Sequence, residues 1–344
     1  MKKAFVFVSL LAVVAMFLAA CGPAATTQPP ATQPPATQPP ATEPPTAVPP
    51  TAEPTAVPFG TADKPIIVAF EPSGTSTEIT AGGQALLDLL SQETGLTFKG
   101  VIPTSYAALT EAMGSGNAQI GWMATFAYIL AHQKGFADVA LITSRFGSDH
   151  YGSQFIANVK SGFTPAADKP GTEAELAPTL AQFKGKKACF GDPESTSGYV
   201  VPMIFLKNAG LTDADIPDPV FTGGHTQTVQ AIYDGGICDY GATFVDARSN
   251  IAKTSADVND KVVVIYQTQA LIPNDNMSYA PDLPKDLRDK ITLAMLKVAG
   301  TDAGKKALND LYQIGGLTVV DDTAYDQFRA YLTTAGIDLS KYVK

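Results

Sequence analysis

The sequence predicts an α/β fold of two lobes, each built around a parallel or mixed sheet with helices on both faces. Three observations lead to this prediction. Apolar runs typical of buried strands alternate with helical runs over residues 65–146, the alternation starts again over 187–244, and two long extended segments, 150–162 and 261–273, follow the two sets. Regular alternation of strands and helices is the pattern of a parallel sheet covered by helices.

The first set of elements follows a proline-rich segment. Its apolar, β-branched runs predict strands, and its leucine- and alanine-rich runs predict helices. Strands are expected at 65–70, 96–103, 118–123 and 138–146, and helices at 81–94, 106–113 and 126–134. Trp122 is expected in the core, and His132 and Arg145 are expected to be surface or structural residues.

The second set repeats the pattern. Strands are expected at 187–191, 218–223 and 238–244, and helices at 199–208 and 226–233. The remainder of the chain, residues 287–315 and 324–335, is amphipathic and is expected to be largely helical.

The two long extended segments are the expected hinge strands between the lobes. One lobe then comprises residues 61–152 together with 273–344, and the other comprises residues 153–272. Ligands of open α/β sheets bind at the carboxyl ends of the strands, close to helix N-termini. We therefore expect a ligand-binding cleft where the two lobes face each other.

The N-terminus carries the features of an export signal. Lys2 and Lys3 precede an apolar run, residues 4–20, that is short for a membrane span and ends in Leu-Ala-Ala before Cys21. This pattern predicts a lipoprotein signal peptide over residues 1–20 and lipidation of Cys21, which places the protein outside the cytoplasm on a membrane. Lipid chains contribute about 0.8 kcal/mol per buried methylene. The alternative is an ordinary secretory signal with a cysteine there by chance.

Residues 21–60 form a predicted tether. The unit TQPPA repeats from Thr27 to Ala41, and the Pro, Thr and Ala bias continues to about Pro58. Such a segment lacks the apolar groups needed to offset the entropy of ordering. Proline-rich chains are extended by about 3.1 Å per residue, so the tether can reach on the order of 100 Å. It is either a stalk that holds the folded part away from the membrane or a glycosylated spacer.

Charge and cysteine content narrow the function further. The chain has 24 Lys and Arg against 33 Asp and Glu, a net charge of −9 that becomes −11 without Lys2 and Lys3. A protein this acidic is not expected to bind nucleic acid.

With Cys21 lipidated, Cys189 and Cys238 remain in strand-like segments that run into glycine. They form either a disulfide, as an oxidising compartment allows, or two small buried core residues.

The most informative motif is the run Gly191 to Tyr199, GDPESTSGY, between an apolar strand and an apolar helix. Early amides of a helix have no partner within the helix and lie at the positive end of its dipole. Ser195, Thr196 and Ser197 add hydroxyl donors, and Gly198 permits close approach. These features suit a small oxyanion. The alternative is plain N-capping by serine or threonine.

Four segments resemble a known family. The runs DPESTSGYVVP, TGGHTQTVQAIYDGGICDYGATFVDAR and LIPNDNMSYAPDLP, together with SYAALTEAMGSGNAQIGWMATFAYILA, resemble the phosphate, phosphite and phosphonate substrate-binding proteins of ABC importers. The resemblance covers most of residues 61–344. It implies the two-lobed periplasmic-binding-protein fold of the second type. It also implies a small oxyanion ligand, a membrane permease as partner and no cofactor.

The resemblance also implies a set of ligand-binding residues. The set consists of the hydroxyls at one helix start, a histidine, tyrosines and acidic groups: Ser195, Thr196, Ser197, His225, Tyr106, Tyr128, Tyr151, Asp246 and Asp275. Asp246 is expected to accept a hydrogen bond from a protonated oxyanion and to repel sulfate.

The sequence also departs from the family pattern. Ala124-Thr125-Phe126-Ala127 replaces a Gly-Pro-Phe-Ser-like turn, Asp246 replaces a frequent glutamate, and residues 163–180 form an apparent insertion. These departures leave the ligand and the pocket size open.

Two other functions use the same residues. A secreted lipoprotein hydrolase would use Ser195 or Ser197 with His225 and Asp246 as a triad, but neither serine has the flanking glycines of a G-x-S-x-G elbow. A sensory ligand-binding module would have the same sequence features as an importer component. The chain has no GxxxxGK[ST] or HExxH motif, so nucleotide hydrolysis and zinc proteolysis are not expected, and neither is a metal site.

Overall fold

The computed structural model describes residues 58–342 of the chain. The predicted signal peptide, Cys21 and most of the predicted tether lie outside the described residues. Within the described part of the chain, no helix combines the length and the apolar character that crossing a membrane requires.

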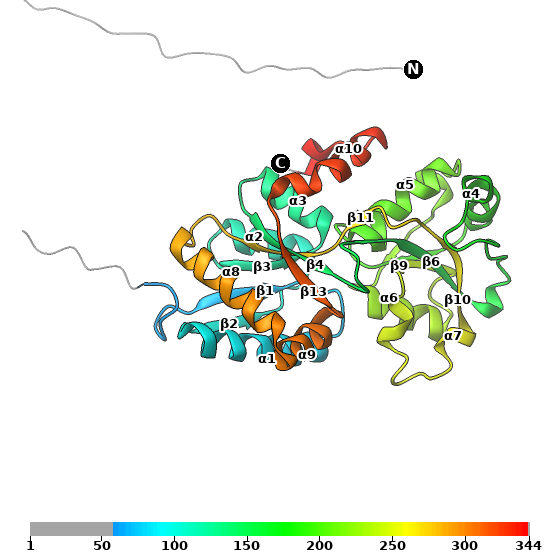
Figure 1. The fold of residues 1–344 in the computed structure, drawn as a ribbon. Coiled ribbons are helices and arrows are strands. Elements are labelled where there is room, and N and C mark those ends of the chain that lie inside the picture. The colour runs from blue at the N-terminus through cyan, green and yellow to red at the C-terminus, as the bar shows by residue number, and fades with distance from the viewer. Residues whose placement is uncertain (1–57, 343–344) are drawn as a thin grey trace, which may run out of the picture. The chain divides into compact units, whose positions relative to one another are not determined.

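Lobe 1 is built on a six-stranded mixed sheet with the strand order β13-β4-β12-β3-β1-β2 (Figure 1). Strand β1 pairs in parallel with β2 and β3, whereas β12 and β13 run antiparallel to their neighbours. The strands are β1 (Ile66–Phe70), β2 (Phe98–Val101), β3 (Ile120–Met123), β4 (Asp138–Ser144), β12 (Asn276–Tyr279) and β13 (Gly316–Val319).

Helices cover both faces of this sheet. Alternate residues of β1 point to opposite sides, because Ile66 and Val68 join one core and Ala69 joins the other. The first core lies under α1 (Ser76–Thr94), α8 (Lys285–Gly300) and α9 (Asp302–Tyr312). The second lies under α2 (Tyr106–Gly114), α3 (Thr125–Gln133) and α10 (Asp326–Thr334). Burial on both faces explains why these strands read as continuous apolar runs.

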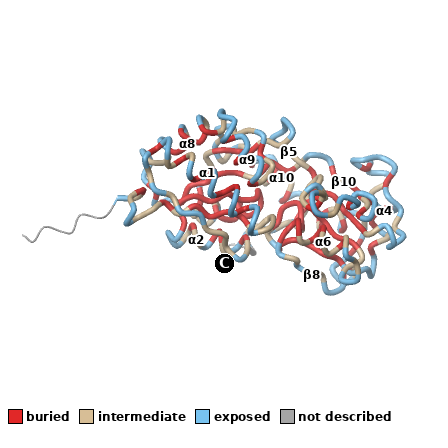
Figure 2. The backbone as a smooth tube through the Cα atoms, turned by 90° about the horizontal axis from the view of Figure 1, so that it is seen from below, coloured by how far each residue is buried: buried red, intermediate tan, exposed pale blue. Residues whose placement is uncertain are grey.

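Lobe 2 has a five-stranded mixed sheet with the order β10-β6-β9-β7-β8. Its strands are β6 (Ser153–Asn158), β7 (Ala188–Phe190), β8 (Val220–Phe221), β9 (Tyr240–Phe244) and β10 (Val262–Gln267). Its helices are α4 (Glu173–Leu180), α5 (Val201–Asn208), α6 (His225–Asp234) and α7 (Val258–Lys261). Figure 2 shows the buried stretches gathered in two groups, one in each lobe. The prediction of two α/β lobes with mixed sheets is confirmed.

The chain passes between the lobes twice, through β5 (His150–Tyr151) and β11 (Ile272–Pro273), which pair antiparallel. The two extended segments expected at 150–162 and 261–273 each contain two strands, β5 and β6 in the first and β10 and β11 in the second. Gly152 separates β5 from β6, and a Cβ atom at this position would lie 2.7 Å from the Thr268 carbonyl oxygen. The close approach of the two crossing segments therefore requires glycine.

A disulfide joins Cys189 in β7 to Cys238 in the segment that leads into β9, with a Cα–Cα distance of 5.7 Å. Of the two alternatives open from the sequence, the structure contains the disulfide. It links two segments 49 residues apart on one face of the lobe 2 sheet.

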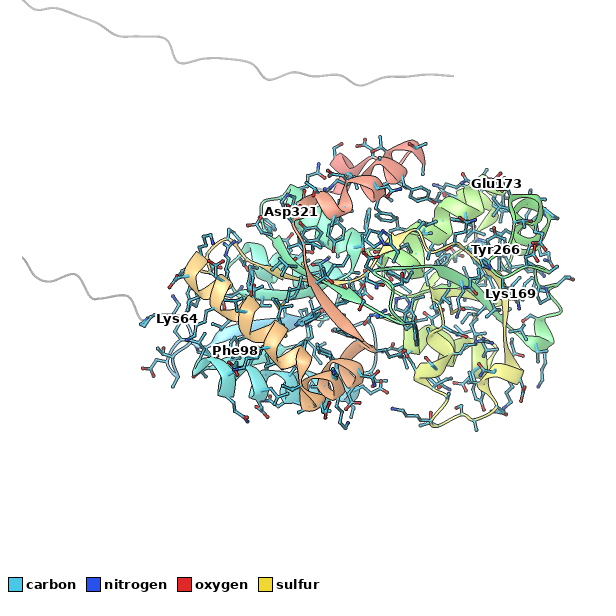
Figure 3. All side chains as sticks on the ribbon, viewed as in Figure 1. Lys64, Phe98, Lys169, Glu173, Tyr266 and Asp321 are labelled. Carbon is cyan, nitrogen blue, oxygen red and sulfur yellow. A yellow bond between two sulfur atoms is a disulfide. The ribbon has the colours of Figure 1, made fainter. Side chains whose placement is uncertain are left out.

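Residues 163–180, the apparent insertion, form a loop and helix α4 at the far end of lobe 2. Figure 3 labels Lys169, Glu173 and Tyr266 there. The Tyr266 hydroxyl donates to the Gly171 carbonyl oxygen at 3.2 Å, and Glu175 with Thr172 forms a capping box at the start of α4. The insertion therefore packs against β10 and does not line the cavity described below.

Candidate ligand-binding site

A small cavity lies between the two lobes. Lobe 1 and the crossing segment contribute Glu71, Ser73, Ala124, Arg145, Tyr151 and Asp275, and lobe 2 contributes Ser195, Ser197, His225 and Phe244. The cavity has a volume of about 10 Å³, which is room for about one water molecule.

Direct hydrogen bonds between the lobes surround this cavity. The His225 amide donates to the Ser73 carbonyl oxygen at 3.0 Å, and the Phe126 amide donates to Thr196 Oγ1 at 2.9 Å. The Tyr106 amide, at the start of α2, donates to the Asp192 carboxylate at 3.3 Å. Residues of both lobes are therefore needed to enclose the cavity.

The STSG turn is helical from Thr196, where a short π-helix (Thr196–Val200) leads into α5. Ser195 caps this helix, because its Oγ accepts from the Gly198 amide at 3.2 Å. Thr196 is used in the contact between the lobes. Ser197 is 1% exposed, and its hydroxyl has no partner of regular geometry within residues 58–342. The capping alternative therefore holds for Ser195, and the oxyanion role of the turn stays a prediction.

Gly198 is needed where the turn passes His225. A Cβ atom there would lie 2.7 Å from Ser195 Oγ and 3.1 Å from a ring carbon of His225. Only glycine lets the turn and the histidine approach so closely.

His225 is the first residue of α6 and is 5% exposed. Burial, with the positive charge of Arg145 adding to it, lowers the pKa of His225 to about 3. The ring is therefore neutral near pH 7. Its Nε2 atom lies 3.4 Å from Ser195 Oγ, and Nδ1 has no hydrogen-bond partner among the described residues. If Nε2 accepts from Ser195, Nδ1 carries a hydrogen that it can donate to a ligand.

Arg145 follows β4 and pairs with Asp275, with a distance of 2.6 Å between Arg145 Nη2 and Asp275 Oδ2. The side chains are 10% and 15% exposed. Burial raises the pKa of Asp275, and the guanidinium opposes this effect. Arg145 also lies over the Phe244 ring at 5.3 Å, and its Nε hydrogen has no partner in the described part of the chain.

Arg145 thus lines the cavity, although the sequence suggested a surface or structural residue. Its position directly after a buried strand, where the carboxyl ends of strands face the cleft, was the available signal.

Glu71 also lines the cavity and is not among the ligand-binding residues expected from the sequence. It follows β1, is 4% exposed and accepts a hydrogen bond from the Ala124 amide. The Tyr312 hydroxyl donates to its carbonyl oxygen at 2.7 Å. Burial and the negative charge of Asp275 raise the pKa of Glu71 well above its ordinary value. A charged residue at the end of the apolar run VAF was the signal that could have found it.

The predicted tyrosines have three different environments. Tyr151 lines the cavity, and burial raises the pKa of its hydroxyl. Tyr106 is buried behind Glu71, and burial followed by the Glu71 charge raises the pKa of Tyr106. Tyr128 lies elsewhere: its hydroxyl donates to Asp322 at 2.7 Å, and its ring packs 4.7 Å from that of Tyr325. We therefore omit Tyr128 from the site.

Asp246 lies outside the cavity lining, in contrast to the sequence expectation. Its carboxylate accepts from Arg248 at 2.5 Å and from Gln154 at 3.0 Å, and it caps the turn Ala247–Asn250. Burial would raise the pKa of Asp246, but the hydrogen bonds from Arg248 and Gln154 outweigh it and lower the pKa. An ion-paired carboxylate of this kind has a structural role, so we omit Asp246 as well.

No cluster of three or more metal-ligating side chains occurs within residues 58–342. Beside the cavity, a larger cleft of about 300 Å³ shares Ser73, Arg145 and Phe244 with it. Residues of α1, α9 and the segment 249–253 line this cleft. It provides space next to the small cavity.

Two lobes joined by two crossing segments, with a small polar cavity enclosed between them, define a solute-binding protein. Residues 68–325 match the family model described as ABC transporter, phosphonate, periplasmic substrate-binding protein. The match covers most of the chain, and the protein belongs to this family.

Two characterised relatives are similar in sequence. The phosphate-import protein PhnD of Mycolicibacterium smegmatis is 31% identical over 205 residues, which cover 57% of this chain and 59% of the relative. The phosphonates-binding periplasmic protein of Escherichia coli is 24% identical over 225 residues, which cover 64% of this chain and 62% of the relative. The matched part thus spans less than two thirds of each relative.

Solved structures share the fold. PhnD1 of Prochlorococcus marinus, in complex with methylphosphonate, superposes with a TM-score of 0.69 at 16% identity, covering 79% of this chain and 98% of that one. A binding protein component of an ABC phosphonate transporter from Pseudomonas aeruginosa gives a TM-score of 0.66 at 20% identity, with coverages of 83% and 95%. These similarities confirm the expected periplasmic-binding-protein fold of the second type.

Proposed function

We propose that this protein is the extracytoplasmic solute-binding component of an ABC importer and that it captures phosphonate, phosphite or phosphate in the cavity between the lobes. The observation that carries the proposal is a set of buried donors around the cavity. Arg145 Nε and His225 Nδ1 have no protein partner among the described residues, and Ser197 Oγ, close to the Tyr151 hydroxyl, has no hydrogen bond of regular geometry there. Leaving a buried polar group unpaired costs about 1–3 kcal/mol, so such groups around one cavity indicate a ligand that pairs them.

The composition of the cavity favours an oxyanion. Hydroxyl, imidazole and guanidinium donors converge there, and Tyr151 adds a neutral phenol. Hydrogen bonds from such donors to an anionic oxygen are stronger than those between neutral groups. The two sequence relatives, a phosphate-import protein and a phosphonates-binding periplasmic protein, agree with this ligand class. The neighbouring cleft has room for a substituent on the ligand.

Capture in this proposal involves closure of the lobes. Residues 61–152 with 273–344 form one moving body, and residues 153–272 form the other. They turn about β5 and β11, because these are the two crossings of the chain. The contacts that the ligand makes with both lobes then stabilise the closed arrangement and offset the free-energy cost of closing.

Anchoring is part of the same proposal. The Leu-Ala-Ala-Cys run predicts that Cys21 is lipidated, and the proline-rich tether would hold the folded part near its permease. Metabolic labelling with a fatty acid, compared between wild type and Cys21→Ser, tests this part separately from ligand binding.

The protein acts by binding rather than by catalysis in this proposal. A serine triad would need Asp246 next to His225 Nδ1, but Asp246 is hydrogen-bonded to Arg248 and Gln154. A sensory module of the same fold would bind the same ligand. Uptake of labelled ligand by cells with and without the protein distinguishes import from sensing.

Isothermal titration against phosphate, phosphite, methylphosphonate and sulfate tests the proposed ligand class. We expect saturable binding of at least one phosphorus oxyanion with one site per chain. Absence of binding to every phosphorus oxyanion would remove the proposal.

A further inference from the structure

Glu71 is an unusual group to find on the wall of an anion pocket. Its side chain is 4% exposed, lines the cavity, and directs one oxygen at the Ala124 amide, at the start of α3. A second carboxylate, Asp275, lines the same cavity. An anion entering next to two carboxylates is repelled unless positive charge or a proton compensates.

The fixed charges around Glu71 do not supply that compensation. Arg145 is paired with Asp275 at 2.6 Å, so these two charges offset each other. His225 is neutral near pH 7, because burial lowers its pKa to about 3. The titratable and charged groups that face Glu71 or influence its charge are Asp275, Asp192, Tyr106, Tyr312, Arg145, Tyr151 and His225. With Glu71 ionised, this set has an excess of negative charge, and a bound oxyanion adds more.

We propose that Glu71 and the bound oxyanion share one proton, and that the site thereby selects oxyanions able to carry a proton near neutral pH. The inference rests on the proposed function and names the chemical class that the site prefers. An ionised Glu71 accepts a hydrogen bond from a hydrogen phosphonate, hydrogen phosphite or hydrogen phosphate. A protonated Glu71 donates to the corresponding dianion, and both routes give the same complex with the same number of protons.

Sulfonates and sulfate bring no such proton. They bind only while Glu71 itself is protonated, so their affinity falls as Glu71 ionises. Burial and the charge of Asp275 raise the pKa of Glu71, which moves this ionisation to higher pH. Asp275 cannot take the role, because Arg145 already holds it in an ion pair.

The experiment compares methylphosphonate with methanesulfonate, two ligands of nearly the same shape that differ in the proton. Calorimetric titrations are made from about pH 5.5 to about pH 8.5 on wild type, Glu71→Gln and the control Glu93→Gln. Glu93 is on the exposed side of α1, paired with Lys297. Glutamine keeps the oxygen that accepts from Ala124 and replaces the shared proton by an amide donor that is present at every pH.

In wild type we expect the affinity for methanesulfonate to fall about tenfold per pH unit once Glu71 ionises, since one proton is bound with each ligand. In Glu71→Gln the affinity for methanesulfonate becomes independent of pH, and at the highest pH it exceeds that of wild type by at least about tenfold. Glu93→Gln behaves like wild type. The proposal is supported equally if methanesulfonate binds to Glu71→Gln but not to wild type.

Three results overturn the proposal: a wild-type affinity for methanesulfonate that does not change with pH, a Glu71→Gln variant that keeps the pH dependence, and a variant that still excludes methanesulfonate. The wild-type series needs no variant, so the proposal stays testable if Glu71→Gln fails to fold. If no phosphorus oxyanion binds to wild type, the proposed function fails. If methylphosphonate binds and any of these three results appears, only the role of Glu71 fails.

Discussion

The Nε2 atom of His225 lies 3.4 Å from the Oγ atom of Ser195, so the starts of two helices of lobe 2 meet at one point of the cavity wall. The contact fixes the imidazole ring and leaves Nδ1 without a partner among residues 58–342. Ser197, two residues further along the same turn, lines the cavity, and its hydroxyl makes no hydrogen bond of regular geometry within the described part of the chain. Ser195 therefore positions the imidazole ring, whereas His225 and Ser197 are available to a ligand.

Ser197→Ala should weaken binding of methylphosphonate about tenfold to a hundredfold, because it removes one hydrogen bond to a charged ligand. The thermal midpoint of the free protein should change little, since the hydroxyl has no regular partner within residues 58–342. Titration calorimetry and thermal unfolding measure the two effects. Ser161→Ala, on an exposed 3-10 turn, is the matched control. Equal affinities for all three proteins would remove Ser197 from the site.

His225 should make the free protein less stable in acid. Its pKa is about 3 in the folded state and near 6.5 when unfolded, so only the unfolded chain takes up its proton between these values. The contribution of His225 to stability is complete above about pH 6.5 and decreases by about 1.4 kcal/mol per pH unit down to about pH 3.

Denaturant unfolding between pH 7 and 4 measures this dependence, and His225→Gln should flatten it. Imidazole NMR gives an independent check on the same ring. A His225 ring in the free protein that titrates near pH 6.5 would contradict the buried, neutral state.

Arg145→Met should destabilise the free protein by about 3–5 kcal/mol, because it leaves the Asp275 carboxylate buried without its partner. Adding Asp275→Asn should restore part of the loss, since no unpaired charge remains. Urea unfolding of wild type, the two single variants and the double variant forms a complete cycle. Strictly additive effects would show that the pair is not coupled.

Ligand binding should bring the lobes closer together, because both lobes supply cavity residues. Small-angle scattering of the free and the saturated protein measures the change as a decrease in the radius of gyration. Identical scattering in the two states, with saturation shown by calorimetry, would argue against a hinge at β5 and β11.

Local patterns predicted much of this molecule. The alternation of apolar strands and helices predicted both sheets, and the GDPESTSG run indicated a helix start at the cavity, where Ser195 and Ser197 lie. The short strands β12 and β13 were not predicted. Each has four residues, and their pairing with β4 joins segments more than 130 residues apart. Pairing over such separations depends on tertiary packing, which a local pattern does not contain.

The acidic and basic residues of the site were the least predictable. Asp246 follows a buried strand, as Glu71 does, but Arg248 two residues later neutralises it. Glu71 instead meets the Ala124 amide, 53 residues away, and Asp275. Which carboxylate faces the cavity therefore depends on where each strand end lies in the fold.

A crystal structure of the protein with bound methylphosphonate tests the central claim most directly. The account predicts the phosphonate oxygens in the cavity between the lobes, within hydrogen-bond distance of Ser197 Oγ, His225 Nδ1 and the Arg145 guanidinium, with one oxygen next to Glu71. A phosphonate bound elsewhere, or bound in the cavity without contact to these donors, would contradict the account.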